Sequence, residues 1–283
     1  MVGGVVGAGE FLYFCGMENV NGTPDGFPAL SAAVRKRIRS LALARNRRAE
    51  GLFVAEGHKC VLDLASAFSL ELVAATREWL QEHASELPGG CTVYAVSPAE
   101  LERLSLLSTP QDVLAVFRLP QENNVDVSEL AGRLVVALDC VQDPGNVGTI
   151  VRMADWMGVD TVLLGSGTAD VFGPKTVQAT MGSLARVRTI RCELTELLPL
   201  LRKAGMEVYV TALNGQDIYS CPLTADGVVV MGNEGRGVSD EVRALASRSL
   251  LIPPYPADAP TAESLNVAVA TALTLGEFRR RVR

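Results

Sequence analysis

Three polar loops carry the residues whose types and spacing best suit chemistry, and each loop follows a short apolar segment. The first loop, residues 139–146, reads DCVQDPGN and leads into a helical pattern that presents Arg152. The second, MGNEGRGVSDE (231–241), is rich in glycine, and the third, IPPYPADAPTAESLNVAVA (252–270), is rich in proline. Amide, carboxylate, hydroxyl and guanidinium groups of this kind bind and orient polar substrates.

Each loop taken alone also has an ordinary structural explanation. Asn146 and Ser239 are good helix N-caps, a tight turn needs glycine, and the third loop could be a rigid connection that ends in a Ser cap. The chemical interpretation therefore depends on the three loops occurring together and on the elements that position them.

Well-known catalytic and cofactor motifs are missing from the sequence. GAGEFL (7–12) and GSGTAD (165–170) lack the third glycine of a dinucleotide-binding loop, and no P-loop or GxSxG motif occurs. His58 and His83 both fall in the first half, and the six scattered cysteines form no CxxC pair. We therefore expect no metal site, no disulfide framework, no nucleotide-dependent redox chemistry, and neither phosphoryl nor acyl transfer. Such cysteine usage is typical of the reducing cytoplasm.

Short buried strands alternating with helices predict how the three loops are brought together. This alternation predicts a parallel sheet covered on both faces, with ligands bound at loops beyond the carboxyl ends of its strands. The strand patterns are RLVVALD (133–139), VDTVLLG (159–165), EVYVTAL (207–213), GVVVMG (227–232) and SLLIPP (249–254), and the helical patterns are NVGTIVRMADWMG (146–158), ELTELLPLLRKAG (193–205) and SDEVRALAS (239–247).

The first half of the chain predicts a smaller α/β domain over residues 30–120, joined by a polar linker at 121–132 to the domain at 133–283. Residues 1–29 form an apolar leader without a basic start, which we interpret as a tail or extended arm rather than a secretion signal. No run of 18 apolar residues predicts a membrane span. The elements expected in the small domain are a helix from Leu30, strands at 52–57, 70–76 and 112–120, a helix at 58–68 and a capping box that opens a helix at Ser97.

Basic residues are concentrated in the first of these helices, although the chain as a whole has a net charge of −6. Residues 31–48 hold seven bases and no acid, so i,i+4 partners within the run cannot neutralise it. A polyanion would relieve this repulsion, whereas the simpler interpretation is a solvated helix face. We predict that the phosphates of such a polyanion contact Arg35, Lys36, Arg39 and Arg45.

Taken together and in this order, DPGNVGTIVRMADWMG, VVVMGNEGRGVS and IP…ESLNVAVA resemble the three signature motifs of the SpoU (TrmH-like) RNA ribose 2′-O-methyltransferases. The six-residue step from Asn146 to Arg152 fits that family, as does FGPKTVQATMGSLARV (172–187) between the first two motifs. The basic helix and LFVAEGHK resemble the small substrate-binding domain that many members carry in front. The resemblance covers roughly residues 30–278.

The resemblance implies an α/β catalytic domain of SPOUT type, with a parallel sheet and a deep trefoil knot, that binds S-adenosylmethionine and works as a homodimer. The implied reaction is methyl transfer to a ribose 2′-hydroxyl of RNA. Lys175 could contact phosphate, although a surface lysine needs no such role. The implied catalytic residues are Asn146, Arg152, Glu234, Ser264 and Asn266, and the implied cofactor contacts are Gly232, Ile252 and Leu265.

Arg152 is expected to orient the ribose or a phosphate and to stabilise developing alkoxide charge. A guanidinium with a pKa of about 12 or above is a poor base at neutral pH, so we do not expect it to take the proton. We expect Glu234 and Asn146 to hold Arg152, and Ser264 and Asn266 to position the ribose and the cofactor.

The separate N-terminal domain favours ribosomal RNA as the substrate, because a structured site must be found by shape as well as by base. A transfer RNA methyltransferase is the alternative substrate class, and a non-catalytic RNA-binding or ribosome-assembly protein is the alternative function. The complete polar set argues against the second alternative. The third motif departs from the family pattern and predicts a differently shaped cofactor pocket, because Ala268 replaces a common Ser and the loop is crowded by Pro253, Pro254, Pro256 and Pro260.

Overall fold

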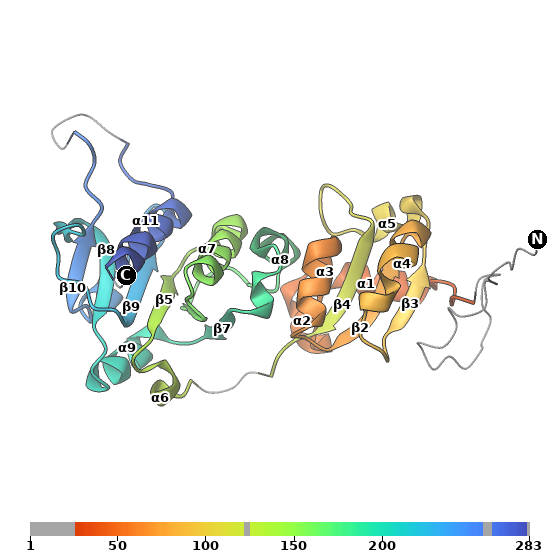
Figure 1. Cartoon of the computed structure of the whole chain (residues 1–283), viewed down its shortest axis with the longest axis horizontal. Coiled ribbons are helices and arrows are strands. Elements are labelled where there is room, and N and C mark those ends of the chain that lie inside the picture. Colours follow the sequence, from red (N-terminus) through yellow and green to blue (C-terminus); the bar gives the residue numbers. More distant parts are fainter. Residues whose placement is uncertain (1–25, 122–124, 257–261, 282–283) are drawn as a thin grey trace, which may run out of the picture. The chain divides into compact units, whose positions relative to one another are not determined.

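The computed structural model describes residues 26–121, 125–256 and 262–281, which belong to two compact units that meet in sequence at Leu119 and Pro120 (Figure 1). Most of the leader, and the part of the proline-rich loop that includes Pro260, lie outside the described residues. Each unit has a sheet of its own. No helix in the described ranges is long and apolar enough to cross a membrane.

The first unit contains a four-stranded mixed sheet in the order β1-β4-β2-β3. β4 runs antiparallel to β1 and β2, and β2 runs parallel to β3. The strands follow the predicted segments except β3, whose four residues TVYA give too short a pattern to be recognised. Their bounds are β1 Leu52–Glu56, β2 Leu70–Ala75, β3 Thr92–Ala95 and β4 Val113–Arg118.

Side chains that alternate along β1 pack on opposite faces of this sheet. Leu52 belongs to a core cluster with Ile38 of α1 and Leu101 of α5, whereas Phe53 packs edge-on against Phe68, which follows α3. The predicted capping box at the start of α5 is confirmed. The helices of the unit are α1 Ala32–Ser40, α2 Ala44–Glu50, α3 His58–Ala65, α4 Arg77–His83 and α5 Pro98–Leu104.

The second unit contains a six-stranded sheet in the order β10-β8-β9-β5-β6-β7, and every neighbouring pair is parallel, which confirms that prediction. The central strands β5 and β9 are buried along their whole length. β7 was not predicted, because its RTIR sequence at the sheet edge exposes both charged ends. The bounds are β5 Leu134–Asp139, β6 Thr161–Leu164, β7 Arg188–Arg191, β8 Val208–Asp217, β9 Gly227–Gly232 and β10 Arg248–Leu251.

Helices cover both faces of this second sheet (Figure 1). Leucines of α9 and Leu130 of α6 share one core cluster with alternate residues of β5, β8 and β9, while α7 and α11 pack against each other on the opposite side. The bounds are α6 Val127–Leu130, α7 Pro144–Trp156, α8 Pro174–Thr180, α9 Leu194–Lys203, α10 Asp240–Arg243 and α11 Val267–Arg280.

Part of the segment 121–132, which the sequence predicted to be a linker, packs into the second unit instead. The Asp126 side chain caps α6, and Leu130 is only 2% exposed in the core. The polar appearance of the segment hid Val125 and Val127, which pack against the same core cluster. Three well-placed apolar residues are therefore enough to dock this short helix.

Candidate active site

The three polar loops meet at one edge of the parallel sheet. β5 and β9 are neighbours, and their last residues, Asp139 and Gly232, lie opposite each other in the register. The first and second loops therefore leave the sheet side by side, at the carboxyl ends of the strands. The backbone N–H of Ser239 donates to Asp139 Oδ2 at 2.7 Å and ties the second loop to the first. The third loop connects β10 to α11, which packs against α7.

Two asparagines and one glutamate join the three loops through their side chains. Asn146 Nδ2, in the first loop, donates to Glu234 Oε1 in the second at 3.0 Å. Asn266 Nδ2, in the third loop, donates to Asn146 Oδ1 at 3.0 Å. These pairs are 88 and 120 positions apart in sequence, so only the fold brings them together. We call Asn266, Asn146 and Glu234 the amide chain; it unites three of the five predicted catalytic residues.

The direction of each bond in the amide chain follows from its Asn266 end. Asn266 is the N-cap of α11, and its Oδ1 accepts the N–H groups of Ala268 and Val269, which leaves Nδ2 to face Asn146. Asn146 therefore accepts with Oδ1 and donates with Nδ2. The Glu234 carboxylate at the far end acts as an acceptor.

Both units resemble known protein families. Residues 34–115 match the MRM3-like substrate binding domain, and residues 133–276 match the SpoU rRNA Methylase family. The chain belongs to the SpoU rRNA methylase family. One SpoU-type relative is RlmP of Bacillus subtilis, a 23S rRNA (guanosine(2553)-2′-O)-methyltransferase that is 37% identical over 196 residues, covering 69% of this chain and 75% of the relative.

Solved structures resemble the chain over most of its length. A TrmH-family structure from Porphyromonas gingivalis matches with a TM-score of 0.81 at 40% identity, covering 90% of this chain and all of that one. An AdoMet-bound rRNA methyltransferase from Sinorhizobium meliloti matches with a TM-score of 0.78 at 31% identity, covering 90% and 97%. Both matches extend well beyond the SpoU domain and therefore include residues of both units.

Within this SpoU site, no hydrogen bond or ion pair in the described residues joins Arg152 to the amide chain. α7 begins at Pro144 with Asp143 as its side-chain N-cap, so Asn146 lies inside the helix rather than at its cap. Arg152 falls on the third turn of this helix. The Arg152 side chain is exposed, and the described residues give it no hydrogen bond or ion pair. The expectation that Glu234 and Asn146 hold Arg152 is not met, because they bond to each other.

The other predicted residues of the SpoU site have different degrees of exposure. Ser264 and Leu265 lie just before α11 and are exposed, Leu265 by 48%, whereas Ile252 after β10 is half-buried. Gly232 has no room for a side chain, because a Cβ would come within 2.2 Å of the backbone of its own loop. Lys175 is exposed on α8. Within the described ranges, no cluster of His, Cys, Asp and Glu side chains is suited to a metal ion.

Sequence reasoning missed three polar residues that shape the SpoU loops. Asp143 caps α7, and the Asp-Pro pair at a helix start could have predicted it, because proline favours the first helical position. Asp139 and Asn233 bond to neighbouring loops, since Asp139 accepts from Ser239 and Asn233 donates to the Cys140 carbonyl. Such contacts leave no local pattern.

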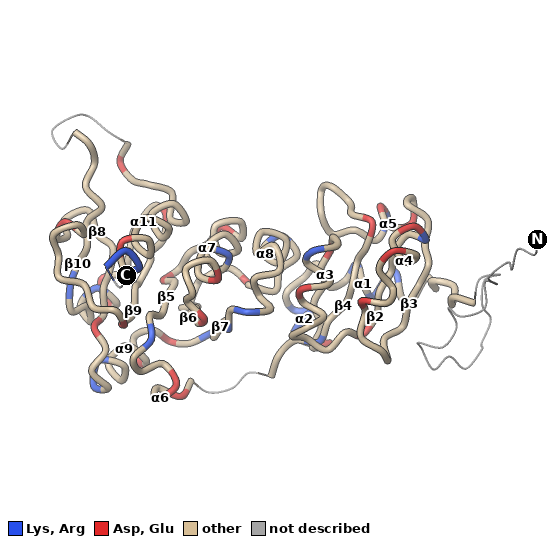
Figure 2. Tube along the Cα trace, viewed as in Figure 1, with Lys and Arg blue, Asp and Glu red and all other residues tan. Residues whose placement is uncertain are grey.

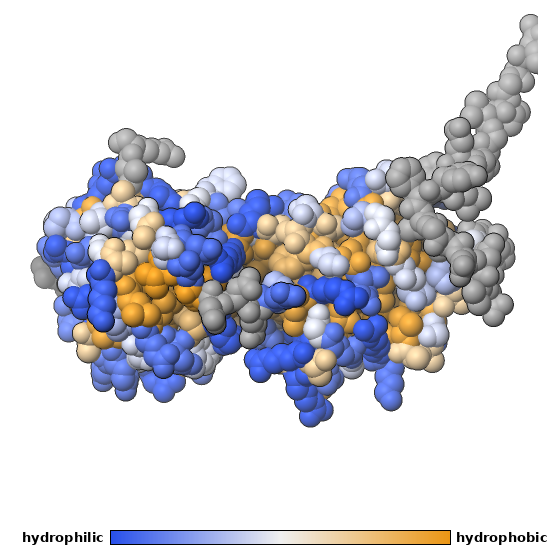
Figure 3. Space-filling view, turned by 90° about the horizontal axis from the view of Figure 1, so that it is seen from below, coloured by the Kyte–Doolittle hydropathy of each residue, from blue (hydrophilic) through white to orange (hydrophobic). Residues whose placement is uncertain are grey.

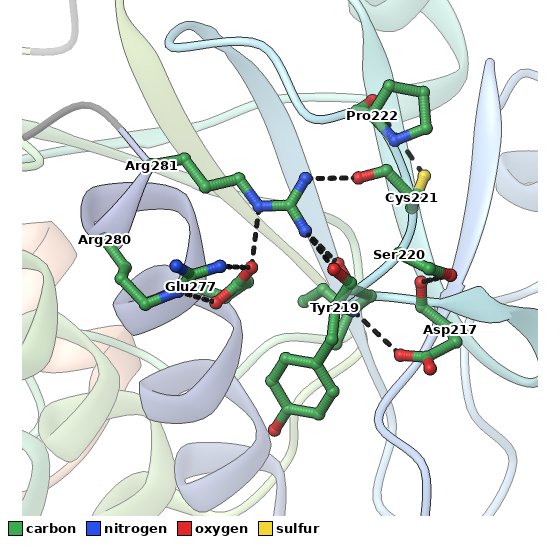
Figure 4. Close-up of polar contacts among 9 residues, drawn as sticks. Asp217, Tyr219, Ser220, Cys221, Pro222, Glu277, Arg280 and Arg281 are labelled. Carbon is green, nitrogen blue, oxygen red and sulfur yellow. Dashed lines mark hydrogen bonds and ion pairs between the residues drawn. The ribbon is translucent and has the colours of Figure 1, made fainter.

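Polar bonds also hold the end of α11 that is remote from Asn266 (Figure 4). Glu277 is 4% exposed and accepts from Arg280 Nε at 2.7 Å and Arg281 Nε at 2.6 Å. The Arg280 bond and then the Arg281 bond lower the pKa of Glu277 to about 2. Arg281 also donates to backbone carbonyls of the turn at 218–221. α11 is therefore fixed at both ends, which holds its N-cap in place.

Figure 2 colours the Lys and Arg positions along the chain, among them those of the basic segment 31–48 in the first unit. Several of these cations bond within the protein. Arg37 pairs with Glu50 at 2.5 Å, and Arg39 donates to a backbone carbonyl of α5. Arg47 is 3% exposed and donates to two backbone carbonyls at 2.7 and 2.9 Å. Partners outside the run therefore bind these arginines: Glu50, just beyond it, pairs with Arg37, and backbone carbonyls accept from Arg39 and Arg47.

Other cations of the basic segment are exposed. Among the predicted RNA contacts, Lys36 and Arg45 are exposed and Arg35 is half-buried. Arg48, which was not predicted, is exposed as well. The part of the chain that the structure describes provides no ion pair for Lys36, Arg45 or Arg48. These cations are the ones available to an external polyanion.

Proposed function

We propose that the protein transfers a methyl group from S-adenosylmethionine to a ribose 2′-hydroxyl of ribosomal RNA. The observation that carries the proposal is the amide chain, which joins all three polar loops at one edge of a parallel sheet in a SpoU-family chain. The relatives support it: RlmP is named for a guanosine of 23S rRNA, and the Sinorhizobium meliloti neighbour is an AdoMet-bound rRNA methyltransferase.

The residues at the site suit S-adenosylmethionine, which has both apolar and polar parts. Ile252 and Leu265 offer partly exposed apolar side chains in the third loop, and residues 235–237 of the second loop are exposed. Ile252 and Leu265 would cover apolar parts of the molecule, and backbone groups would meet its polar parts. When bound, S-adenosylmethionine supplies a methyl group on a positively charged sulfur.

The protein's own side chains orient the ribose and stabilise charge on its 2′ oxygen. Arg152 carries a positive charge, which stabilises the negative charge that develops on this oxygen as the hydroxyl releases its proton to solvent water. The amide chain keeps the three loops in fixed positions, which lets Glu234 and the exposed Ser264 position the ribose. A protein that only binds RNA would not need this set of side chains.

We place the RNA contact of the first unit at its exposed cations, Lys36, Arg45 and Arg48. The match of residues 34–115 to a substrate binding domain supports this placement. Single positive charges on exposed side chains contact phosphates without reading sequence. Arg35 and Arg39 contribute less, because Arg35 is half-buried and Arg39 already donates to a carbonyl of the protein.

We also propose a trefoil knot in the second unit. β10 lies at the edge of the sheet, yet the chain then returns to place α11 against α7, the helix that follows the central strand β5. This return path, which crosses back over earlier loops, supports the threading of the C-terminal part that a knot requires.

A cytoplasmic location stays a prediction from the scattered cysteines.

We propose a homodimer on the basis of an apolar stripe along α11. Val269 and Leu273 are four residues apart on α11 and are 49 and 42% exposed, and Trp156 of the neighbouring α7 is 84% exposed. Apolar side chains reach the surface of each unit (Figure 3). A stripe of large apolar groups at helical spacing fits a partner helix.

Methyl transfer from labelled S-adenosylmethionine to unmethylated ribosomal RNA, free and in ribosomal subunits, tests the function. We expect the label to be released as a 2′-O-methylnucleoside. Arg152→Ala should still bind S-adenosylmethionine in a calorimetric titration but should transfer at least about 100-fold more slowly. Label on a base, label in transfer RNA alone, or S-adenosylmethionine binding without any transfer would overturn the proposal.

A further inference from the structure

The second loop of the site closes on itself through Asn233. The N–H of Asn233 donates to the Gly237 carbonyl at 2.9 Å, and the N–H of Gly237 donates to the Asn233 carbonyl at 2.8 Å. The turn is tight, because Gly237 has a φ of +71° and a Cβ at Gly232 would come within 2.2 Å of the Gly237 backbone. The two backbone bonds between Asn233 and Gly237 therefore largely fix the shape of residues 233–237.

The Asn233 side chain uses both of its polar atoms. Oδ1 accepts the N–H groups of Gly235 at 3.0 Å and Arg236 at 3.1 Å, inside the loop. Nδ2 donates to the carbonyl of Cys140 at 3.0 Å, just beyond β5, and lies 3.5 Å from Glu234 Oε2. The orientation of the amide is unambiguous, because backbone N–H groups require the oxygen and a carbonyl requires the nitrogen.

We propose that Asn233 is a positioning residue for methyl transfer, with Oδ1 shaping the second loop and Nδ2 setting Glu234 against Asn146. The inference rests on the function proposed above. The Nδ2 bond attaches the second loop to the end of the neighbouring strand, immediately next to Glu234 in sequence. Glu234 is then held on both oxygens, by Asn146 on Oε1 and more weakly by Asn233 on Oε2.

The backbone of Cys140, which accepts the Nδ2 bond, supports this assignment. Cys140 has a φ of +59°, a left-handed conformation that is strained for residues other than glycine. Such a conformation persists only where surrounding contacts hold it, and the Asn233 amide is one of these contacts. The two loops therefore hold each other in the geometry that presents Glu234.

Replacing Asn233 by aspartate separates its two roles. Asn233→Asp keeps an oxygen for Gly235 and Arg236 but places a second oxygen where Nδ2 met the Cys140 carbonyl and Glu234. We expect kcat to fall by about 10–100-fold, with S-adenosylmethionine affinity and the KM for RNA changed by less than about threefold. Asn233→Ala removes both roles and should also weaken S-adenosylmethionine binding.

Gln111→Glu in the first unit is the matched control. The Gln111 amide also donates to backbone carbonyls, those of Thr109 and Pro110, so the substitution makes the same change of nitrogen to oxygen. It should leave kcat unchanged. Thermal unfolding of both variants shows whether each remains folded under the assay conditions.

A double variant tests whether Asn233 acts through Glu234. In a Glu234→Gln background, Asn233→Asp should cause little further loss of kcat, because the carboxylate that it positions is already gone. Losses that multiply would overturn the inference, as would normal kcat in Asn233→Asp. If the wild-type protein is active and Asn233→Asp is normal, only this inference fails. If the wild-type protein transfers no methyl group, the proposed function fails with it.

Discussion

In the second unit, Asn266, Asn146 and Glu234 bond to one another across three loops, whereas in the first unit Lys36 and Arg45 extend from the surface as separate charges. Removing a member of the bonded set breaks a bond that positions its partners, so the partners lose part of the geometry in which they act. Removing an exposed cation leaves no such partner, and salt screens its effect. Mutational effects should therefore be large and non-additive in the second unit, and small and additive in the first.

The amide chain provides the largest expected effect and the strictest test of non-additivity. Asn146→Ala removes both bonds at the centre of the chain, and we expect kcat to fall by about 100-fold or more. Glu234→Gln should cost a similar factor, and the double variant little more than either, because the residues act as a unit. Single-turnover methyl transfer measures all three rates. Losses that multiply would show that Asn146 and Glu234 work independently.

Local patterns predicted most of the framework around these residues. β5 and β9 are continuous apolar runs, and Ser97 with Glu100 forms the capping box that their spacing predicts. Asp143 could also have been predicted, because a side-chain cap followed by proline is a purely local signal. Elements fixed by neighbouring residues are therefore accessible from sequence, and the parallel sheet follows from them.

Contacts between distant segments could not be predicted from such patterns. Asn146, Glu234 and Asn266 were selected by resemblance, but their mutual bonds depend on a register between strands that the sequence does not reveal. The same limit applies to Arg47, whose burial against two carbonyls is invisible in a run of arginines. α6 was missed because its few apolar residues pack against α9, far along the chain.

α7 packs closely on α8 at Gly148, so a larger side chain there should affect the stability of the second unit. A Cβ at Gly148 would lie 2.5 Å from the Ala179 Cβ and 2.6 Å from the Thr176 carbonyl oxygen. Gly148→Ala should therefore lower the free energy of unfolding by about 1–3 kcal/mol, measured by denaturant titration. Gly276→Ala is the matched control, because a Cβ meets nothing within 4 Å there, in α11. Gly276→Ala should raise the free energy of unfolding by about 0.5–1 kcal/mol. If Gly148→Ala and Gly276→Ala changed this free energy equally, close packing at Gly148 would not be the cause.

The remote end of α11 predicts a smaller effect that depends on pH. The Arg280 and Arg281 bonds lower the pKa of Glu277 from 4.5 to about 2, so the ionised form is favoured in the folded protein. The resulting stability is fully present above pH 4.5 and is lost as the pH falls toward 2. Glu277→Gln keeps an acceptor but should remove this part of the acid dependence. Urea midpoints measured across this range check it, and an unchanged pH profile in the variant would rule it out.

The exposed cations predict the smallest effects, and additive ones. Lys36→Ala and Arg45→Ala should each reduce the slope of log RNA affinity against log salt concentration by about 0.7–0.9, with S-adenosylmethionine affinity unchanged. The double variant should show the sum of the two reductions, because each cation contacts phosphate on its own. Binding titrations at several salt concentrations measure the slopes.

Arg37→Ala is the control for these cations, because Arg37 already pairs with Glu50 at 2.5 Å and lies 3.9 Å from Glu71. Its positive charge is balanced within the protein, so its removal should change the salt slope less than the loss of Lys36 or Arg45. If Arg37→Ala changed the salt slope as much as Lys36→Ala or Arg45→Ala, the basic segment would attract RNA through its total charge rather than through separate contacts. The same conclusion would follow if the double variant did not show the sum of the Lys36→Ala and Arg45→Ala slope changes. Mutational effects would then be non-additive in both units.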